Sequence, residues 1–346
     1  MQVRKFKSTG GTAMREFAGK TAFVTGGAAG IGLALGRAFA QSGMKVMLAD
    51  IETDALQAAV KSLQEISPNI SGTICDVADA ESVERAARAT FDAFGRVHVV
   101  CNNAGVAAGG GIDHISLDNW RWVIDVNLMG VLHGIKSFLP HIRAHGEGGH
   151  IVNTASMAGM QGGLGFSPYA ASKFAVVNMS EGLALQLRPH GIGVSVLCPH
   201  FVRTGIGESG RNRPERYGQP QPLDPASPAA AMVAEIARQN GAGLEPAAVA
   251  ARVLSAIRDD ELYIFTHPGM RAEVEPRFAA ILAALDKGAG PIIPGVSGPH
   301  DAVPAGKTTL DMRPRNGGFR KAFGTWIWMD LNGRRRHRRW STCRTA

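Results

Sequence analysis

The stretch TGGAAGIG, residues 25–32, determines how the rest of this sequence is interpreted. It lies where an apolar run, residues 21–26, gives way to a segment with helical periodicity. Glycine permits the tight turn and the close approach of a phosphate at such a junction, and the N-terminus of the following helix stabilises negative charge. A glycine triplet alone is a weak signal, because any glycine-rich turn contains one. Evidence from the surrounding sequence is therefore needed to predict whether this turn binds a dinucleotide.

A carboxylate follows at the distance that a dinucleotide site requires. Asp50 ends the second apolar run, residues 45–50, and lies eighteen residues after Gly32. A carboxylate at this position can accept hydrogen bonds from both ribose hydroxyls of an adenosine. It would also repel a 2′-phosphate, and neither Ala29 nor Ile51 supplies a compensating positive charge. The sequence therefore predicts NAD rather than NADP, with a turn or helix-cap role for Asp50 as the alternative.

Short apolar runs alternate with amphipathic segments, which is typical of a parallel sheet covered by helices on both faces. The first predicted helix carries Ile31, Leu35, Ala38 and Phe39 on one face and ends near Gly43. We therefore expect a single α/β domain of the Rossmann type, with a doubly wound, mostly parallel sheet of seven strands. The predicted strands are residues 21–26, 45–50, 72–77, 97–105, 150–156, 193–199 and 261–267.

The middle of the chain is mildly acidic, whereas its two ends are basic. The 346 residues carry a net charge of +8, but eleven Lys and Arg against two Asp and Glu lie in residues 307–346. We expect a basic extension in residues 1–17, the Rossmann domain in 18–285 and a basic, disordered tail in 286–346. Within the domain, the region 205–246 is rich in Gly, Pro and Arg and too long for a plain connection, so we interpret it as a substrate loop or lid.

Composition also limits the function classes. The four cysteines, Cys75, Cys101, Cys198 and Cys343, form no C-x-x-C pair and no zinc spacing, so we expect neither disulfides nor a metal site, as in a reducing cytoplasm. No apolar run reaches the roughly 18 residues of a membrane span, and the basic start lacks the apolar segment of a signal peptide. We expect a cytoplasmic protein that does not bind membranes, with any affinity for nucleic acid confined to the basic tail.

A tyrosine and a lysine stand one helical turn apart in SPYAASK, residues 167–173. At positions i and i+4, Tyr169 and Lys173 share one helical face, although such a pair also arises by chance on solvated helices. The unperturbed pKa of a phenol is near 10, so tyrosine becomes a useful base at neutral pH only beside a positive charge. Lys173 can supply that charge, which makes the pair a candidate acid–base site.

The spacing T-G-x-x-x-G-x-G in residues 25–32 resembles that of the short-chain dehydrogenase/reductase family, and the resemblance covers about residues 18–268. Further motifs agree, namely NNAG, VNLMG, NTASMAG, Y-x-x-x-K and CPHFVRT. His200 departs from the family pattern, which usually has Gly there; it could touch substrate, face solvent or cap a backbone group. The resemblance implies catalytic roles for Asn127, Ser156, Tyr169 and Lys173. It implies an NAD site made of Thr25, Gly26, Gly30, Ile31, Gly32, Asp50, Asp76, Val77, Asn103, Ala104, Gly105, Tyr169, Lys173, Pro199, Val202 and Thr204.

The resemblance implies hydride transfer between NAD and a secondary alcohol or ketone. In that mechanism Tyr169 is the general base or acid, Ser156 orients the reacting oxygen, Lys173 lowers the pKa of the tyrosine and binds the nicotinamide ribose, and Asn127 supports Lys173 and a water relay. Segments such as GLEP, residues 243–246, are similar to the NAD-dependent Cα-dehydrogenases of lignin-derived β-aryl ethers, which oxidise a benzylic alcohol.

Other interpretations stay open. Phe201 and Tyr217 could cover an aromatic substrate or serve only to pack the loop. The protein could instead be a ketone or 3-oxoacyl reductase of the same family, or a catalytically silent NAD-binding sensor or scaffold. Asp50 argues against a reductase. The complete set of Ser, Tyr, Lys and Asn argues against a catalytically silent sensor or scaffold. Family analogy further predicts a homodimer or homotetramer that pairs through helices around residues 115–140 and 168–190.

Overall fold

The computed structural model describes residues 13–108, 112–162, 167–219, 226 and 228–288. The chain divides into two compact units, residues 1–282 and 283–346, and the sheet lies in the first. Residues 289–346, which are most of the predicted basic tail, and residues 1–12 of the predicted extension lie outside the described residues, so our expectations for them stay predictions.

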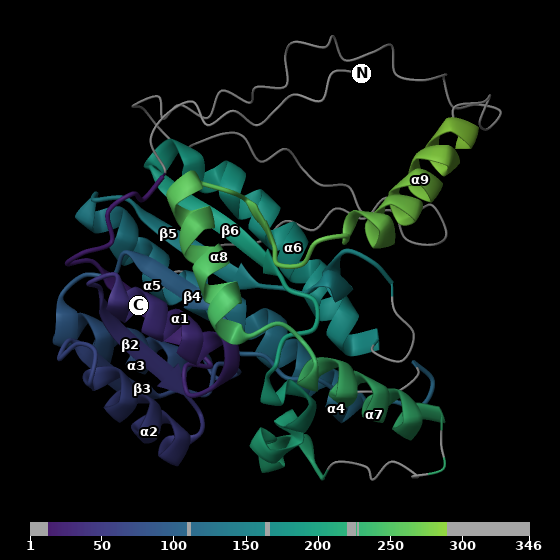
Figure 1. Cartoon of the computed structure of the whole chain (residues 1–346), viewed down its shortest axis with the longest axis horizontal. Helices are drawn as coiled ribbons and strands as arrows, with labels where there is room; N and C mark the ends of the chain where they lie inside the picture. The colour runs from purple at the N-terminus through teal and green to yellow at the C-terminus, as the bar shows by residue number, and fades with distance from the viewer. Residues whose placement is uncertain (1–12, 109–111, 163–166, 220–225, 227, 289–346) are drawn as a thin grey trace, which may run out of the picture. The chain divides into compact units, whose positions relative to one another are not determined.

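Within the described residues, seven parallel strands form one sheet in the order β3-β2-β1-β4-β5-β6-β7 (Figure 1), which confirms the predicted doubly wound fold. The order reverses between β1 and β4, and ligands of open parallel sheets bind outside the strand ends at such a reversal. The strands are β1 (Thr21–Thr25), β2 (Lys45–Asp50), β3 (Ile70–Ile74), β4 (Val99–Asn102), β5 (Gly149–Thr154), β6 (Ile192–Cys198) and β7 (Tyr263–Phe265).

Helices cover both faces of the sheet, so the inner strands are apolar on both sides. In β1, Phe23 packs into the core on one face and Val24 into the core on the other. The first core is closed by α3 (Ala80–Phe94), α4 (Leu117–Ile124), α5 (Gly130–His145) and α6 (Ser167–Leu187), and the second by α1 (Gly30–Gln41), α2 (Thr53–Gln64) and α8 (Pro246–Asp259). The remaining described α-helices are α7 (Pro228–Gly241) and α9 (Arg271–Gly288).

Several boundaries differ from the sequence-based expectation; the strand predicted at residues 97–105, for example, is β4, Val99–Asn102. The strand predicted at residues 72–77 is β3, which begins at Ile70 and ends at Ile74; β3 is an edge strand, and the apolar residues that follow it pack in a loop. Met14 and Phe17, which we placed in the N-terminal extension, are buried, and the Phe17 ring lies 6.3 Å from that of Phe39. The packed part of the chain therefore begins before residue 18.

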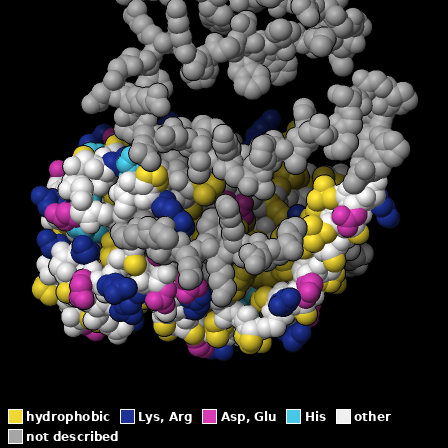
Figure 2. All heavy atoms as spheres, turned by 90° about the horizontal axis from the view of Figure 1, so that it is seen from above, with side chains coloured by type: hydrophobic (Ala, Val, Ile, Leu, Met, Phe, Trp, Pro, Cys, Tyr) yellow, Lys and Arg dark blue, Asp and Glu magenta, His cyan; other side chains and the backbone are white. Residues whose placement is uncertain are grey.

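The described surface carries charges of both signs. On the face shown in Figure 2, Lys and Arg side chains alternate with Asp and Glu side chains. No helix in the described part of the chain combines the length and apolar character needed to cross a membrane. Cys75, Cys101 and Cys198 are buried and not disulfide-bonded.

Candidate functional site

The glycine-rich turn brings the start of α1 close to the end of β1. Gly26 and Gly30 have φ values of +63° and +52°, which side-chain-bearing residues rarely adopt. A Cβ on Gly32 would lie 1.9 Å from the carbonyl oxygen of Gly26, so only glycine fits there. No side chain caps the N-terminus of α1. Its first backbone N–H groups are therefore available to an anionic ligand.

Asp50 is both a turn residue and part of the cavity wall. Its Oδ2 accepts a hydrogen bond from the backbone N–H of Ala28 at 2.9 Å, and its Oδ1 accepts one from Glu52 N at 3.1 Å. Each carboxylate oxygen can accept more than one hydrogen bond, so capacity remains for ribose hydroxyls. The two interpretations that the sequence left open for Asp50 are therefore compatible.

Thr25 joins the ends of the two strands at which the sheet order reverses. Its Oγ1 accepts hydrogen bonds from Asn103 N at 2.9 Å and Ala104 N at 3.0 Å, and Asn103 Nδ2 donates to Thr25 O at 3.1 Å. These bonds hold the NNAG segment against the glycine turn. Every predicted cofactor residue except Thr25 and Gly32 lines one cavity of about 430 Å³, and these two support its wall from behind.

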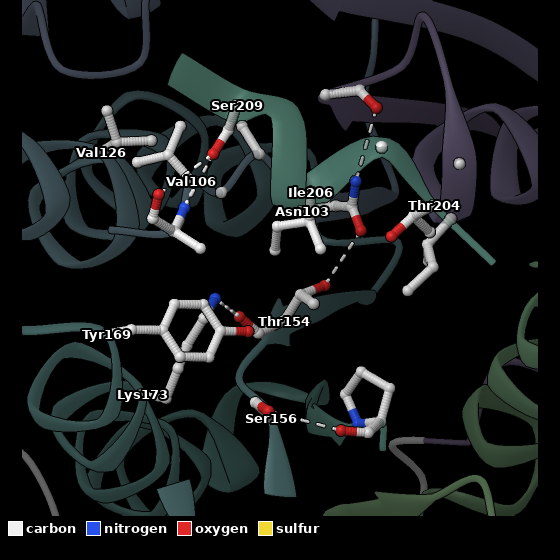
Figure 3. Close-up of a pocket in the computed structure, with 18 of the residues that line it drawn as sticks. Asn103, Val106, Val126, Thr154, Ser156, Tyr169, Lys173, Thr204, Ile206 and Ser209 are labelled. Atoms are coloured by element: carbon white, nitrogen blue, oxygen red, sulfur yellow. Dashed lines mark hydrogen bonds between the residues drawn. The ribbon is translucent and has the colours of Figure 1, made fainter. Parts of the chain in front are cut away.

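Tyr169, Lys173 and Ser156 meet in the same cavity (Figure 3). Helix α6 supplies Tyr169 and Lys173, and Ser156 follows β5. Lys173 is 2% exposed, its Nζ donates to the carbonyl oxygen of Thr154 at 2.9 Å, and the same Nζ lies 5.5 Å from the centroid of the Tyr169 ring. Ser156 Oγ donates to the carbonyl oxygen of Pro199 at 3.5 Å. The structure thus brings together three of the four predicted catalytic side chains.

Burial dominates the electrostatics of this group. It lowers the pKa of Lys173 to about 8, because the ammonium has left water. It raises the pKa of Tyr169, and the nearby Ser156 hydroxyl opposes this rise. We expected Lys173 to lower the pKa of the tyrosine; in the protein alone the shift has the opposite sign. The physical reason is that desolvation of the phenolate outweighs every favourable interaction.

The fourth predicted catalytic residue, Asn127, lies in a π-helical turn, Asp125–Met129, and does not line the cavity. Its Oδ1 accepts from Val106 N at 2.8 Å, and its Nδ2 donates to Val106 O at 2.9 Å and to Ser172 Oγ at 3.2 Å. Among the described contacts, Asn127 therefore supports the backbone beside Lys173 rather than Lys173 itself. π-Turns inside helices often occur at functional sites.

The predicted substrate loop is anchored across the cavity by contacts that spacing did not reveal. Arg211 pairs with Glu52 through Nε to Oε2 at 3.2 Å and Nη2 to Oε1 at 2.8 Å. Arg216 Nη2 lies 2.6 Å from Asp76 Oδ2. The partners are more than a hundred residues apart in the chain, so no local pattern could have indicated them. We call residues 205–217 the lid segment.

Much of the cavity lining is apolar. Its side chains include Val106, Trp122, Val126, Met157, Phe201 and Ile206. Phe201 lines the cavity, so its predicted role as a cover for an aromatic substrate stays a hypothesis. Tyr217 does not line the cavity; it is buried, and its hydroxyl donates to Asp125 Oδ2 at 2.9 Å, so it packs the loop.

Comparison with known proteins identifies the family to which this fold and this cavity belong. Residues 20–215 match the family model of the short chain dehydrogenases, and the chain belongs to this family. It is similar to a C alpha-dehydrogenase from Sphingobium sp. strain SYK-6, with 35% identity over 273 residues, 79% of this chain and 88% of the relative.

Solved structures agree with this assignment. A short-chain dehydrogenase/reductase from Burkholderia phymatum, solved in complex with NAD, is 39% identical, with a TM-score of 0.75 over 78% of this chain and 97% of that one. The apo form of LigD from Sphingobium sp. strain SYK-6 is 32% identical, with a TM-score of 0.65 over 78% of this chain and 98% of that one.

Proposed function

We propose that this protein is an NAD-dependent alcohol dehydrogenase that oxidises a secondary alcohol of the benzylic type. The observation that carries the proposal is the pair formed by partly buried Tyr169 and buried Lys173, which shares one cavity with the glycine turn and Asp50. The similarity to a C alpha-dehydrogenase and to an NAD complex supports the same conclusion.

The residues present fit NAD. The Lys173 ammonium has three N–H donors, and the only acceptor that the described residues give it is Thr154 O at 2.9 Å. A buried ammonium is costly unless its donors are satisfied, and ribose hydroxyls would satisfy them. Asp50 retains acceptor capacity for the hydroxyls of the adenosine ribose and would repel a 2′-phosphate in their place. We therefore assign NAD, rather than NADP, to this cavity.

Bound NAD would supply the acceptor for the hydride of the alcohol. During oxidation Tyr169 removes the proton of the substrate hydroxyl, and in the reverse direction it returns that proton to the carbonyl oxygen. Ser156 orients the same oxygen by a hydrogen bond. A charged Lys173 near the phenol favours the phenolate form of Tyr169. Asn127 holds the Val106 backbone in place next to this group.

The apolar wall favours a substrate with an aromatic ring next to the reacting carbon. Trp122, Phe201 and Ile206 line this part of the cavity and offer flat and branched surfaces that a ring can contact. This wall and the similarity to a C alpha-dehydrogenase are the two reasons to prefer benzylic alcohols over sugars, whose hydroxyls would lose their hydrogen bonds to water here.

A panel of secondary alcohols tests the proposal. Benzylic, steroid, sugar and hydroxyacyl alcohols are supplied with NAD or NADP, and reduced cofactor is measured. We expect the highest kcat/KM for a benzylic alcohol with NAD. Equal kcat/KM for the two cofactors would overturn the assignment of NAD. Preferred oxidation of the hydroxyacyl alcohol would indicate the 3-oxoacyl reductase alternative, and cofactor binding without turnover of any substrate would indicate a sensor or scaffold.

A further inference from the structure

A polar cluster interrupts the apolar wall near Ser156. Gln161 and His200 line the cavity, and Glu273, in the first turn of α9, contacts both of them. Gln161 follows β5, His200 follows β6 and Glu273 follows β7. These three strands are neighbours in the sheet, so the segments after their carboxyl ends meet at one edge. The adenosine side, with Asp50 and Asp76, lies after β2 and β3 across the reversal point.

The hydrogen bonds of His200 determine which of its ring nitrogens can donate. Its Nδ1 accepts a hydrogen bond from the backbone N–H of Phe201 at 2.8 Å, so the proton of the neutral ring is on Nε2. Nε2 lies 3.5 Å from Glu273 Oε2, which is longer than a good N–H···O hydrogen bond. The Nε2–H group can therefore donate to a ligand in the cavity.

Glu273 orients the amide of Gln161 in a complementary way. Gln161 Nε2 donates to Glu273 Oε2 at 2.8 Å, and a carboxylate can only accept, so the amide nitrogen faces Glu273 and the amide oxygen faces away. Among the described residues, no group donates to that amide oxygen. Gln161 and His200 share one carboxylate oxygen, so a free acceptor and a free donor lie close together at the cavity wall.

We propose that Gln161 and His200 bind a hydroxyl group of the substrate, distinct from the oxygen that reacts at Tyr169. His200 Nε2–H donates to the hydroxyl oxygen, and the hydroxyl donates to Gln161 Oε1. A hydroxyl is the small group that matches one donor and one acceptor at once. A carboxylate cannot donate, and the charge of Glu273 would repel it. Because the remaining wall is apolar, the substrate class is a secondary benzylic alcohol whose ring carries a phenolic hydroxyl; this inference rests on the proposed function.

Five 1-arylethanols separate this role from electronic effects on the reaction. They are 1-phenylethanol and its 4-hydroxy, 4-methoxy and 4-carboxy derivatives, and the 3-hydroxy isomer covers the other ring geometry. The methoxy group donates electrons as a hydroxyl does but has no proton to give. We expect the better hydroxy isomer to exceed both the methoxy and the unsubstituted compound by about tenfold in kcat/KM. The carboxy compound should be the poorest substrate.

Variants of the cluster then identify the groups responsible. Gln161→Met keeps the length of the side chain and removes the acceptor, so it should lower kcat/KM for the hydroxy compound about tenfold more than for 1-phenylethanol. Glu273→Gln should reduce the same preference, because the amide of Gln161 loses its fixed orientation. The matched control is Gln239→Met: Gln239 donates to Glu235 at 2.6 Å and does not line the cavity. This control should keep the wild-type preference.

The outcomes distinguish failure of this proposal from failure of the proposed function. Equal turnover of the hydroxy, methoxy and unsubstituted alcohols would overturn the hydroxyl site and leave the dehydrogenase assignment intact. So would an equal loss on all substrates in Gln161→Met, which would mean that the cluster only anchors α9. If no alcohol is oxidised, calorimetric titration of the protein with 4-hydroxyacetophenone and with acetophenone, each in the presence of NADH, still tests the site. Equal affinities would overturn it.

Discussion

Tyr169 and Lys173 respond in opposite ways to the same environment. Burial stabilises the neutral form of each, so the pKa of the phenol rises while that of the ammonium falls to about 8. Burial therefore shifts both groups toward their neutral forms, although a pKa of about 8 leaves Lys173 mostly protonated at neutral pH. Ligands that satisfy the Lys173 N–H groups favour the ammonium, and the ammonium favours the phenolate. We thus expect the acid–base site to be completed only when cofactor binds.

The first prediction concerns Tyr169→Phe, which removes one oxygen and preserves the ring. Because a positioned acid or base contributes about 10²- to 10⁴-fold to a rate, we expect kcat to fall by about 10³-fold. Binding of NADH, followed by fluorescence titration, should stay close to wild type. Oxidation at a rate near that of the wild type would show that another group transfers the proton.

The second prediction is a pH dependence of stability that originates at Lys173. Burial lowers its pKa from 10.5 to about 8, so between these pH values the unfolded chain binds more protons at this site than the folded protein, and stability rises with pH. Below about pH 8 the folded protein carries the full cost of a buried ammonium, about 3 kcal/mol from this shift. Lys173→Met lacks this cost. The free energy of unfolding of the wild type, minus that of the variant, should therefore increase from pH 8 to 10.5.

Chemical denaturation of both proteins without cofactor measures this difference. Burial raises the pKa of Cys75, Cys101 and Cys198, which changes stability in the opposite sense over an overlapping pH range. The contributions of Cys75 and Cys101 are the same in both proteins and cancel in the difference, whereas that of Cys198 cancels only in part, because the charge of Lys173 lowers its pKa. A difference that stays constant across this pH range would contradict the shift at Lys173.

The sequence predicted which residues line the cavity better than it predicted the contacts that those residues make. The spacing of the glycine turn, Asp50 and the Tyr169–Lys173 pair follows from local backbone geometry, and these residues meet as expected. The pKa direction of Tyr169 could not be read from spacing, because it depends on how much water the fold removes. The partners of Asn127 were also beyond reach, since they depend on how a π-helical turn directs its amide toward Val106 and Ser172.

At the scale of elements, most inner strands were easier to predict than the edge strands; β4 is an exception, because the run predicted at residues 97–105 continues past Asn102 into the NNAG loop. The strand β2 ends where expected because its apolar run stops at Asp50, and helices cover both of its faces. Edge strand β3 and the short β7 gave weaker signals, because fewer residues of each are buried and the apolar pattern runs on into the loops. The lid segment was recognised by its composition alone. Its anchors, Glu52 and Asp76, belong to loops far away in sequence.

The third prediction tests the lid segment through Arg211→Gln. The ion pair with Glu52 is partly exposed, with 43% of the Arg211 and 28% of the Glu52 side chain accessible, so it contributes about 1 kcal/mol at most. We expect NADH to dissociate up to about fivefold faster, measured by stopped-flow fluorescence. The control is Arg238→Gln, which breaks a similar pair with Glu235 within α7. Equal rates in the wild type and Arg211→Gln would mean that the lid does not retain cofactor.

At the scale of the whole molecule, the fourth prediction is a homodimer or homotetramer. The family analogy places the contact on the long helices, and α6 carries an exposed apolar side chain, Leu185, which is 65% accessible in the isolated chain. A second subunit would cover such a side chain. Light scattering at micromolar concentration measures the mass directly, and a monomer would contradict the prediction.

The fifth prediction is that the basic tail is dispensable for catalysis. The family match ends at residue 215, and the glycine turn, Asp50 and the Tyr169–Lys173 pair all lie before that point. Truncation after Pro294 should therefore leave kcat and the KM for NAD nearly unchanged. Steady-state kinetics of the truncated protein, with circular dichroism to verify folding, provide the test. A large fall in kcat in a folded truncate would show that the tail acts on the active site.

The glycines of this chain differ in whether a larger side chain could replace them. This difference predicts which glycines are kept during evolution. At Gly32 the obstacle to a side chain is the backbone of Gly26, so no neighbouring substitution can compensate, and descendants that keep the site have to keep this glycine. At Gly182, in α6, nothing lies within 4 Å in the isolated chain, and alanine there would favour the helix by about 1 kcal/mol. If relatives nevertheless keep glycine at position 182, the reason would be the close approach of another subunit. Such a contact constrains the sequence although the isolated chain does not contain it.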